Sequence, residues 1–274
     1  MGAVLKISNY TKKGFTQGIK SDTLFLNDTF EAAKRIENAS KKVLPFDSID
    51  EVNRVIYELA KRSMRDVCLF VMGCNTQLRV SDLLDFRWKD ILDQSTGDVK
   101  EEVSKIEKKN KNLRHIYIND AIKLAVNMYR NTLPSISLHD YMFTSQGPRK
   151  NLRAVAYNGD VMLQAQPITE QLVSGIIRSA TKKAGIWTAN RRFSTHSMRK
   201  TGARAAAGYL TGRDLPENLR TEAASIERVR GMLGHSNSQT TARYIDLQDK
   251  FDKTVYLWMN LGIEALTNIK NNIK

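Results

Sequence analysis

The stretch "RDVCLFVMGCNTQLRVSDLLDFRWKDI", from Arg65 to Ile91, indicates a helical fold. Its early part, "VCLFVMGC", is apolar without a polar face, which predicts a helix that is buried on all sides. Ser81 has a side chain suited to capping a helix and should begin a further helix, "SDLLDFRW". Four apolar residues upstream recur with helical spacing: Ile49, Val52, Ile56 and Leu59. This part of the chain should therefore form a helical core.

A hairpin should follow these helices. Residues 97–120, "GDVKEEVSKIEKKNKNLRHIYIND", hold two β-favouring runs around the polar centre "KKNKN", which predicts an antiparallel hairpin with a basic tip. Further helices are expected from Asp120, from the cap Thr169 to about Lys183, and over 199–207 and 225–234, with a loop over 145–160. A last helix over 253–270 should carry an apolar stripe of Val255, Trp258, Met259, Gly262, Leu266 and Ile269. The predicted fold class is mainly α with a small antiparallel β-sheet (α+β).

The expected domain organisation is one domain preceded by an arm. Residues 1–45 are mixed and basic and contain one candidate helix over 28–42, so they are too few for a domain with its own core. Residues 46–274 should form the single folded domain. We find no internal repeat and no low-complexity segment.

The balance of charge favours a nucleic-acid partner. The chain has 43 Lys and Arg against 29 Asp and Glu, a formal charge of +14. From Gln171 to Arg213 no residue is acidic and nine are basic: Arg178, Lys182, Lys183, Arg191, Arg192, Arg199, Lys200, Arg204 and Arg213. A solvated face normally mixes both signs, whereas a surface that follows phosphates does not. A protein that is basic for no such reason is the alternative.

Several functional classes lack their sequence signals. There is no phosphate loop, no GxGxxG, and no HExxH or CxxC spacing, so we expect no metal and no cofactor. The two cysteines, Cys68 and Cys74, lie in the apolar run and should be buried free thiols of a reducing cytoplasm. The longest apolar run is too short to cross a bilayer, and the N-terminus lacks the pattern of a signal peptide.

Two short motifs point to phosphoryl transfer. "THSMRK" (195–200) holds His196 and Arg199, and "LGHSNSQTTARY" (233–244) holds His235 with Tyr244 nine positions later. Without a metal, arginine forks must bind the phosphate oxygens and hold the developing charge. A tyrosine hydroxyl can then be the nucleophile if a base takes its proton. The resulting phosphotyrosyl ester stores the energy of the broken bond, so a strand could be resealed without ATP.

These motifs resemble the HxxR, LGH and Tyr motifs of the tyrosine recombinases, the phage-integrase family. The stretch from Arg65 to Ile91 resembles the first-arginine box of that family, as phage and mobile-element integrases of Gram-positive bacteria carry it. The resemblance runs from about Phe46 to Leu247 in the family's order. It implies the catalytic-domain fold of this family and a bacterial or phage-encoded protein that acts on DNA in the cytoplasm.

The resemblance also implies a role for each matching residue. Arg79 and Arg199 would bind the scissile phosphate, and Tyr244 would attack it to leave a 3′-phosphotyrosyl link and a free 5′-hydroxyl. His196 would assist proton transfer, and His235 would support the phosphate or pack against the tyrosine. Further roles would fall to Asp82, which would orient side chains, and to Lys109, which would donate a proton to the leaving oxygen. Lys108 is the alternative to Lys109, and Lys111 is a third choice.

The implied activity is site-specific cleavage and rejoining of double-stranded DNA by a homo-tetramer on synapsed sites, with an accessory DNA-binding protein as a possible further partner. Further DNA contacts are expected from Lys108, Lys111, Arg191, Arg192, Lys200, Arg204 and Arg243. A DNA-binding regulator that no longer recombines is the alternative, and a type IB topoisomerase shares the chemistry. The resemblance also makes the Trp258/Met259 stripe a candidate contact with a neighbouring subunit.

Three features depart from the family's usual pattern. About 45 residues stand where a core-binding domain of roughly one hundred is usual, so the chain is a member with the catalytic domain alone, a fragment of a longer protein, or a member that uses its arm instead. Gln77 replaces a common glycine, which affects a turn and removes no catalytic atom. The segment "YLTGRDLPENLRTEA" (209–223) looks like an insertion between Arg199 and His235.

Overall fold

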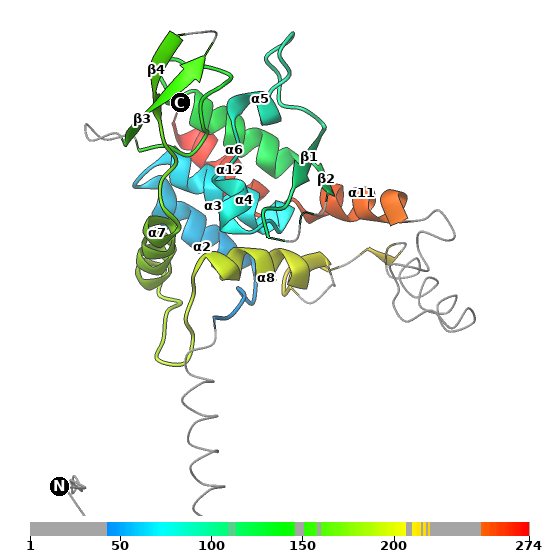
Figure 1. Ribbon diagram of the computed structural model, residues 1–274. Coiled ribbons are helices and arrows are strands. Elements are labelled where there is room, and N and C mark those ends of the chain that lie inside the picture. Colours follow the sequence, from blue (N-terminus) through cyan, green and yellow to red (C-terminus); the bar gives the residue numbers. More distant parts are fainter. Residues whose placement is uncertain are drawn as a thin grey trace, which may run out of the picture. The chain divides into compact units, whose positions relative to one another are not determined.

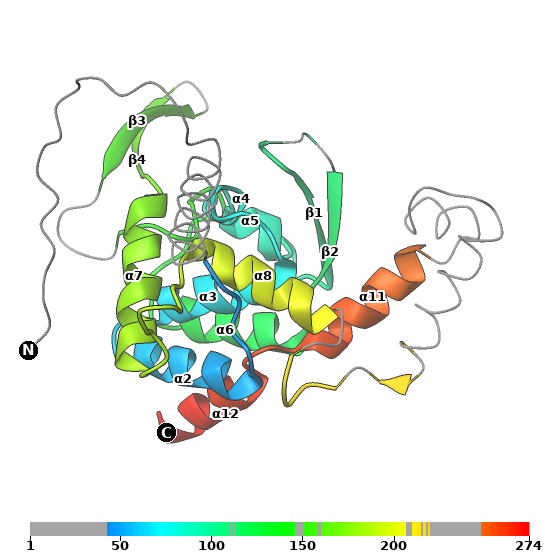
Figure 2. The same ribbon diagram turned by 90° about the horizontal axis from the view of Figure 1, so that it is seen from below.

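Helix α3 is the centre of the fold, in this computed structural model. The structure describes residues 43–109, 111, 113–145, 151–157, 160–206, 210–214, 216, 217, 219 and 248–273. Every residue of α3 from Arg65 to Thr76 is buried, and Ser63 caps the helix by accepting a hydrogen bond from the amide of Arg65. Three other helices, α2, α6 and α8, pack against it (Figure 2). The prediction of a helix buried on all sides is confirmed.

The described elements are mostly helices, with two two-stranded antiparallel sheets (Figure 1). The helices are α2 (Ile49–Ala60), α3 (Met64–Thr76), α4 (Val80–Leu83), α5 (Trp88–Ile91), α6 (Asp120–Arg130), α7 (Glu170–Lys183), α8 (Thr195–Ala206), α11 (Gln248–Met259) and α12 (Ile263–Asn272). The strands are β1 (Glu102–Ile106), β2 (Leu113–Tyr117), β3 (Leu152–Tyr157) and β4 (Asp160–Ala165). The predicted fold class is confirmed. The predicted helices over 28–42 and 225–234 lie outside the described residues.

The predicted helices α2, α6 and α7 are present, and the predicted cap Thr169 is confirmed. Ser48 caps α2 and Thr169 caps α7, each by accepting a hydrogen bond from a backbone amide of the first turn. Helix α6 buries its apolar face, and its cap is Asn119. Helix α8 begins at Thr195, four residues before the predicted start, so the whole "THSMRK" motif is helical.

Helix α8 lies unusually close to α3 at Gly202. A Cβ atom placed there would be 2.1 Å from the carbonyl oxygen of Cys74 and 2.7 Å from Cγ of Gln77. Glycine is therefore the residue that lets the two backbones meet. Gln77 itself ends α3 in the left-handed conformation, with φ of 55°, which explains why a glycine suits this position.

The predicted helix from Ser81 to Trp88 is wrong. The chain forms two short helices, α4 and α5, separated by a turn at Leu84–Asp85. Arg79 is the N-cap residue of α4, and Ser81 lies inside that helix. Phe86 and Trp88 are both buried, at 1% and 2% exposure, and the turn lets both rings enter the core. Asp90 then caps α5 by accepting a hydrogen bond from the amide of Arg87 at 2.9 Å.

The predicted loop over 145–160 is also wrong, because it contains strand β3. Leu152 pairs with Ala165, and the register continues to Tyr157 opposite Asp160. The dipeptide Asn158–Gly159 between these strands is a strong sequence signal for a hairpin, and the loop prediction overlooked it. The two hairpins stand apart from one another in both views (Figures 1 and 2).

The predicted single helix over 253–270 is divided into α11 and α12. The break lies at Gly262, whose φ of 89° no helix interior can adopt. Met259 is fully buried in the core, and Trp258 packs against that core with the guanidinium of Arg213 over its ring. Met259 is therefore not accessible to a neighbouring subunit, whereas a contact of the partly buried Trp258 with such a subunit stays a prediction.

Candidate active site

The two arginines predicted to bind phosphate converge on one carboxylate. Arg79 donates a hydrogen bond from Nη1 to Oε1 of Glu107 at 3.0 Å. Nη1 of Arg199 lies 3.5 Å from the same oxygen, without the geometry of a hydrogen bond. It is a buried donor that has no hydrogen-bond partner among the described residues. Two guanidinium groups from distant parts of the chain therefore surround a position that an anion occupies.

The backbone around α3 brings these arginines together. Arg79 follows α3 directly, as the extended residue before α4. Arg199 lies on α8, which contacts the end of α3 through Gly202. His196 is three positions before Arg199 on α8, so both side chains project from one face of the helix. The imidazole of His196 is exposed to solvent.

Asp82 connects the first arginine box to the β1–β2 hairpin. Its side chain is fully buried, and Oδ1 accepts a hydrogen bond from the amide of Lys108 at 2.9 Å. Oδ2 is buried without a partner among the described residues. Asp82 thus fixes the backbone of the hairpin turn, and its orienting role in a reaction stays a prediction.

The three candidate lysines of the turn differ in what they contact. Lys108 directs Nζ to Oδ1 of Asp85 at 3.0 Å. Lys109 is exposed, and so is Lys111, which has a positive φ of 58° and donates its amide to the carbonyl of Glu107 at 2.9 Å. Lys108 is therefore engaged by an acidic neighbour, whereas Lys109 presents its side chain to solvent.

Burial of Asp85 raises the pKa of its carboxyl, but the hydrogen bonds from Lys108 and Lys105 outweigh burial and leave that pKa below its ordinary value. Lys105 also lies 3.8 Å from the carboxylate of Asp90. The base of the hairpin is thus fixed by ion pairs to the segment that joins α4 and α5.

Two residues of this cluster, Glu107 and Arg114, were not predicted. Arg114 on β2 places Nη1 3.9 Å from Oε1 of Glu107 and donates from Nη2 to the hydroxyl of Tyr256 on α11 at 2.8 Å. A sequence signal existed, because Glu107 is the only acidic residue between Glu102 and Asp120 in a lysine-rich segment.

Of the other basic residues predicted to contact DNA, four lie among the described residues, and the side chains of three of these contact this chain. Arg191 forms a bidentate pair with Glu51 at 2.7 and 2.9 Å, and its guanidinium also lies 2.7 Å from Asp47. Lys200 donates to the carbonyl of Val43 at 2.6 Å, and Arg204 donates to the carboxylate of Asp47 at 3.0 Å. The fourth, Arg192, is exposed.

The pair formed by Arg191 and Glu51 changes both pKa values. Burial raises the pKa of the Glu51 carboxyl, but the Arg191 side chain and the Asp47 amide outweigh it, so this pKa lies below its ordinary value. Its hydrogen bond to Glu51 raises the pKa of Arg191. Arg191 thus stabilises the contact between α2 and the segment before α8, and it could reach a phosphate only by leaving these carboxylates.

His235, Arg243 and Tyr244 lie outside the described residues. Their roles remain predictions from the "LGH" and Tyr motifs. Both cysteines are buried free thiols, as predicted, and burial raises the pKa of each.

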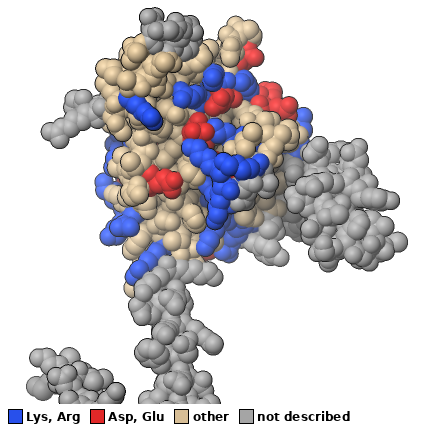
Figure 3. Space-filling model, in the orientation of Figure 1, with Lys and Arg blue, Asp and Glu red and all other residues tan. Residues whose placement is uncertain are grey.

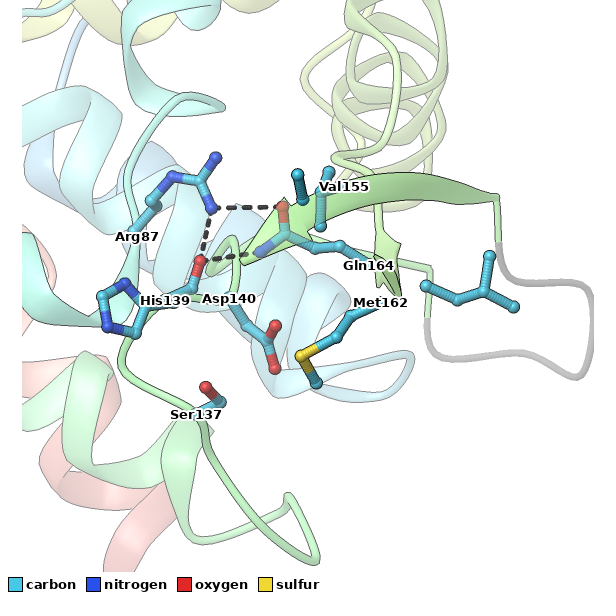
Figure 4. A pocket seen from close by; sticks show the side chains of 9 residues that line it. Arg87, Ser137, His139, Asp140, Val155, Met162 and Gln164 are labelled. Carbon is cyan, nitrogen blue, oxygen red and sulfur yellow. Dashed lines mark hydrogen bonds between the residues drawn. The ribbon is translucent and has the colours of Figure 1, made fainter. Parts of the chain in front are cut away.

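Lys and Arg side chains gather over α8 and the adjacent part of the β1–β2 hairpin (Figure 3). Arg199 lies on α8, and Arg79 and Arg199 both contact Glu107 at the end of β1 in this hairpin. A pocket elsewhere, of about 330 Å³, is lined by Arg87, the 137–140 segment and the β3–β4 hairpin (Figure 4). There Arg87 donates to the carbonyl of His139 and to Gln164. The pocket shares no residue with the arginine cluster.

Comparison with known proteins finds relatives over most of the chain. The model of the Phage integrase family matches residues 42–250 of this chain. The chain belongs to the phage integrase family. A probable integrase/recombinase, YoeC of Bacillus subtilis (strain 168), is 25% identical over 214 residues, which are 78% of this chain and 95% of that protein. The tyrosine recombinase XerC of Staphylococcus carnosus (strain TM300) is 24% identical over 224 residues, 79% of this chain and 62% of that protein.

Solved structures with a similar arrangement include two recombinases. The crystal structure of XerA recombinase has a TM-score of 0.45 and 18% identity, with 85% of this chain and 65% of that chain covered. The integrase from mycobacterium phage Brujita has a TM-score of 0.44 and 18% identity, with 80% and 58% covered. This phage-integrase chain thus spans nearly the whole of the Bacillus relative and about three-fifths of the staphylococcal one.

Neither a metal-binding cluster nor a membrane-spanning helix occurs in the part of the chain that the structure describes. No three His, Cys, Asp or Glu side chains there are grouped as they would be to hold a metal ion. None of its helices has the length and the apolar character needed to cross a bilayer.

Proposed function

We propose that this protein cleaves and rejoins DNA strands at specific sites through a covalent link to Tyr244. The observation that carries the proposal is the convergence of Arg79 and Arg199 on one carboxylate oxygen, at 3.0 and 3.5 Å. Because arginine forks match the oxygens of phosphate as well as those of carboxylate, the same donors can hold a phosphodiester. The partner is double-stranded DNA, to which a charge of +14 is attracted over a long range.

The proposed reaction is a reversible transesterification. The two arginines bind the non-bridging oxygens of the scissile phosphate and stabilise the negative charge that grows on them. The hydroxyl oxygen of Tyr244 forms a bond to phosphorus, and its proton passes to a neighbouring base, for which we propose His196. The bond from phosphorus to the 5′-oxygen breaks as that oxygen takes a proton from Lys109. A 5′-hydroxyl later attacks the phosphotyrosyl link and reverses these steps. The reaction as proposed therefore consumes no ATP and assigns no step to a metal.

The contacts of the hairpin turn support Lys109 as the proton donor. Lys108 has an acidic partner 3.0 Å away and would have to leave it to reach the leaving oxygen. Lys109 follows a residue whose amide is fixed by Asp82, so its backbone is held while its side chain is exposed. A general acid on a fixed backbone is what proton transfer to a defined atom requires.

We further propose that the protein acts as a homo-tetramer on two synapsed sites, and that residues 1–45 form a basic arm ahead of the catalytic domain. Two double-stranded sites contain four strands that must be cleaved. Each cleavage requires one tyrosine, and a tetramer supplies four. A DNA-binding regulator that no longer recombines is the competing function, and the test below separates the two.

The decisive experiment is covalent capture in the source cell. The wild-type protein is purified under denaturing conditions, and any DNA that stays attached is recovered and sequenced. A Tyr244→Phe variant is the test, and Tyr57→Phe is its matched control, because Tyr57 is exposed and its hydroxyl accepts a hydrogen bond from Asn268, far from the arginine cluster in the sequence. We expect DNA with a common end sequence on the wild type and on Tyr57→Phe, and none on Tyr244→Phe.

A different outcome would identify the regulator. If the wild type carries no attached DNA while both it and Tyr244→Phe retain DNA reversibly at the same sites, the proposed chemistry is wrong. If Tyr244→Phe carries as much attached DNA as the wild type, another residue is the nucleophile.

A further inference from the structure

Glu107 has no role in the proposed reaction, although its carboxylate lies at the centre of the arginine cluster. Its side chain is 4% exposed and lies among three guanidinium groups, those of Arg79, Arg199 and Arg114, at 3.0, 3.5 and 3.9 Å from Oε1. A buried carboxylate in such a place neutralises one of three positive charges. Without it the arginines would repel one another, because like charges at this separation interact strongly where water is scarce.

The carboxylate and a phosphodiester would compete for the same donors. Arg79 gives Nη1 to Glu107, and Nη1 of Arg199 is turned toward the same oxygen. A phosphate held by both arginines would place its negative oxygens within a few ångströms of the Glu107 carboxylate. Two anions at that distance repel. The phosphate and the carboxylate therefore cannot both bind the arginine pair at the same time.

The position of Glu107 in the chain gives its departure a consequence. It follows β1 directly and precedes Lys109 by two residues. Its carbonyl accepts a hydrogen bond from the amide of Lys111 within the turn, and its carboxylate connects the start of the turn to Arg79. The Asp82–Lys108 hydrogen bond is a second connection between the turn and the rest of the domain. When the carboxylate leaves the arginines, the first of these two connections is lost.

We propose that Glu107 is a positioning residue that occupies the phosphate-binding arginines in the DNA-free protein and is displaced by the scissile phosphate. This inference rests on the proposed function for its substrate, and it deepens that function. Displacement frees the turn that carries Lys109 at the moment when the phosphate arrives. The Glu107 end of the turn is thus released only when a leaving group is present.

The test is a titration with inorganic phosphate, which needs neither the DNA target nor strand cleavage. Glu107→Gln keeps the shape and removes the charge, and Glu102→Gln is the matched control, since Glu102 is an exposed residue of β1 in the same hairpin. Binding is measured by calorimetry and by the rise in Tm with phosphate.

We expect Glu107→Gln to lower the Kd for phosphate about tenfold, the equivalent of about 1.4 kcal/mol. If the Glu107 carboxylate occupies the arginines for about nine-tenths of the time, the site is open to phosphate for about one-tenth. Phosphate then binds about tenfold more weakly than it binds an open site. Glu102→Gln should change the Kd less than about twofold, because exposed charges at a distance are screened. Adding Arg199→Ala to Glu107→Gln should abolish the gain, which would place the phosphate at the arginine pair.

If Glu107→Gln does not fold, Glu107→Asp replaces it. Aspartate keeps the charge and shortens the side chain by one methylene, so its hold on Arg79 is weaker and phosphate should still bind more tightly than to the wild type. A folded Glu107→Gln or Glu107→Asp protein whose Kd for phosphate is equal to or higher than that of the wild type overturns the proposal.

Hydrogen exchange separates displacement from a purely structural role. In the wild type, phosphate should speed exchange of the Lys111 amide, because its acceptor is the carbonyl of Glu107. In Glu107→Gln this exchange should be fast already and should not respond to phosphate. A static counter-ion would leave the amide unchanged or protect it when phosphate binds, and that result rejects the release of the turn.

Failure of this inference can be told apart from failure of the proposed function. Covalent capture at Tyr244 together with an unchanged phosphate Kd in Glu107→Gln removes the role of Glu107 alone. Tighter phosphate binding in Glu107→Gln without covalent capture leaves an anion site guarded by Glu107 in a protein that does not recombine.

Discussion

Replacing Gly202 by alanine should move α8 and with it the candidate active site. The new Cβ would lie 2.1 Å from the carbonyl oxygen of Cys74, whereas contacts under 3.0 Å are essentially never observed. The backbones of α3 and α8 would therefore have to separate by about 1 Å, since a main-chain carbonyl in a helix cannot rotate away. Overpacking of this kind costs about 3 kcal/mol at the upper end of its range. Alanine recovers about 1 kcal/mol through its helix propensity, so the net loss should be about 2 kcal/mol.

The matched control is Gly175→Ala on α7. Gly175 is exposed, and no atom lies within 4 Å of the position of its added Cβ. The same chemical change should therefore stabilise the protein by about 1 kcal/mol, through helix propensity alone. Urea denaturation of both variants measures the two free energies of unfolding, and the melting temperatures should move in opposite directions, by about 2–4 °C for each kcal/mol.

Gly202→Ala should also impair function more than stability explains. His196 and Arg199 lie on α8 within two turns of Gly202, and a shift of about 1 Å at reacting groups can cost about a hundredfold in rate. The rate of covalent DNA capture, measured where both proteins are folded, tests this effect. If Gly202→Ala unfolds at the same urea concentration as the wild type, the close contact of α3 and α8 is not as described, and the reasoning fails.

Four further predictions concern the site. Arg199→Lys should slow covalent capture by about 100- to 1000-fold while the affinity for DNA changes little, because lysine keeps the charge and loses the fork; wild-type turnover would contradict its role. Lys109→Ala should slow capture at least about a hundredfold and Lys108→Ala only slightly, and the reverse order would make Lys108 the acid. Asp85 has a pKa below its ordinary value in the folded protein, so its contribution to stability is present above about pH 4 and disappears as the pH falls through the lowered pKa. Urea denaturation at pH 6 should therefore show Asp85→Asn to be less stable than the wild type. A difference in stability that does not shrink as the pH is lowered would reject this. DNA binding should weaken steeply with salt, and a flat response would remove the argument from the basic face.

The sequence predicted well those features that depend on neighbours along the chain. Helices α2, α6 and α7 have apolar residues at helical spacing and caps at Ser48, Asn119 and Thr169, and such signals act within one or two turns. The buried character of α3 followed from its apolar run in the same way. The arginines of the site could be named because short motifs carry them, although no local rule says that they meet.

Two of the errors originate in contacts between distant segments, whereas the missed β3–β4 hairpin had a local signal in Asn158–Gly159. The turn between α4 and α5 exists because Phe86 and Trp88 both enter the core, and the composition of this stretch alone suggests one helix. Arg191 was counted as a DNA contact because its neighbourhood is basic, but its partners Glu51 and Asp47 lie far away in the sequence. An excess of positive charge indicates that a partner is anionic, and it does not indicate which guanidinium groups are free.

The turn that carries Lys109 has two attachments, and only one of them involves donors that would also bind the phosphate. Asp82 is fully buried and leaves Oδ2 without a partner among the described residues, which costs free energy of folding. Its Oδ1 accepts the hydrogen bond from the amide of Lys108 and so fixes the turn. That attachment does not involve the phosphate-binding donors, so it can persist through the reaction. The carboxylate of Glu107, two residues from Lys109, has its two shortest contacts with Arg79 and Arg199, the donors that the phosphate also needs, while Arg114 lies farther away at 3.9 Å. Binding of DNA can therefore change the second attachment without disturbing the first, which leaves the turn anchored at Lys108 while Lys109 becomes free to reach the leaving oxygen.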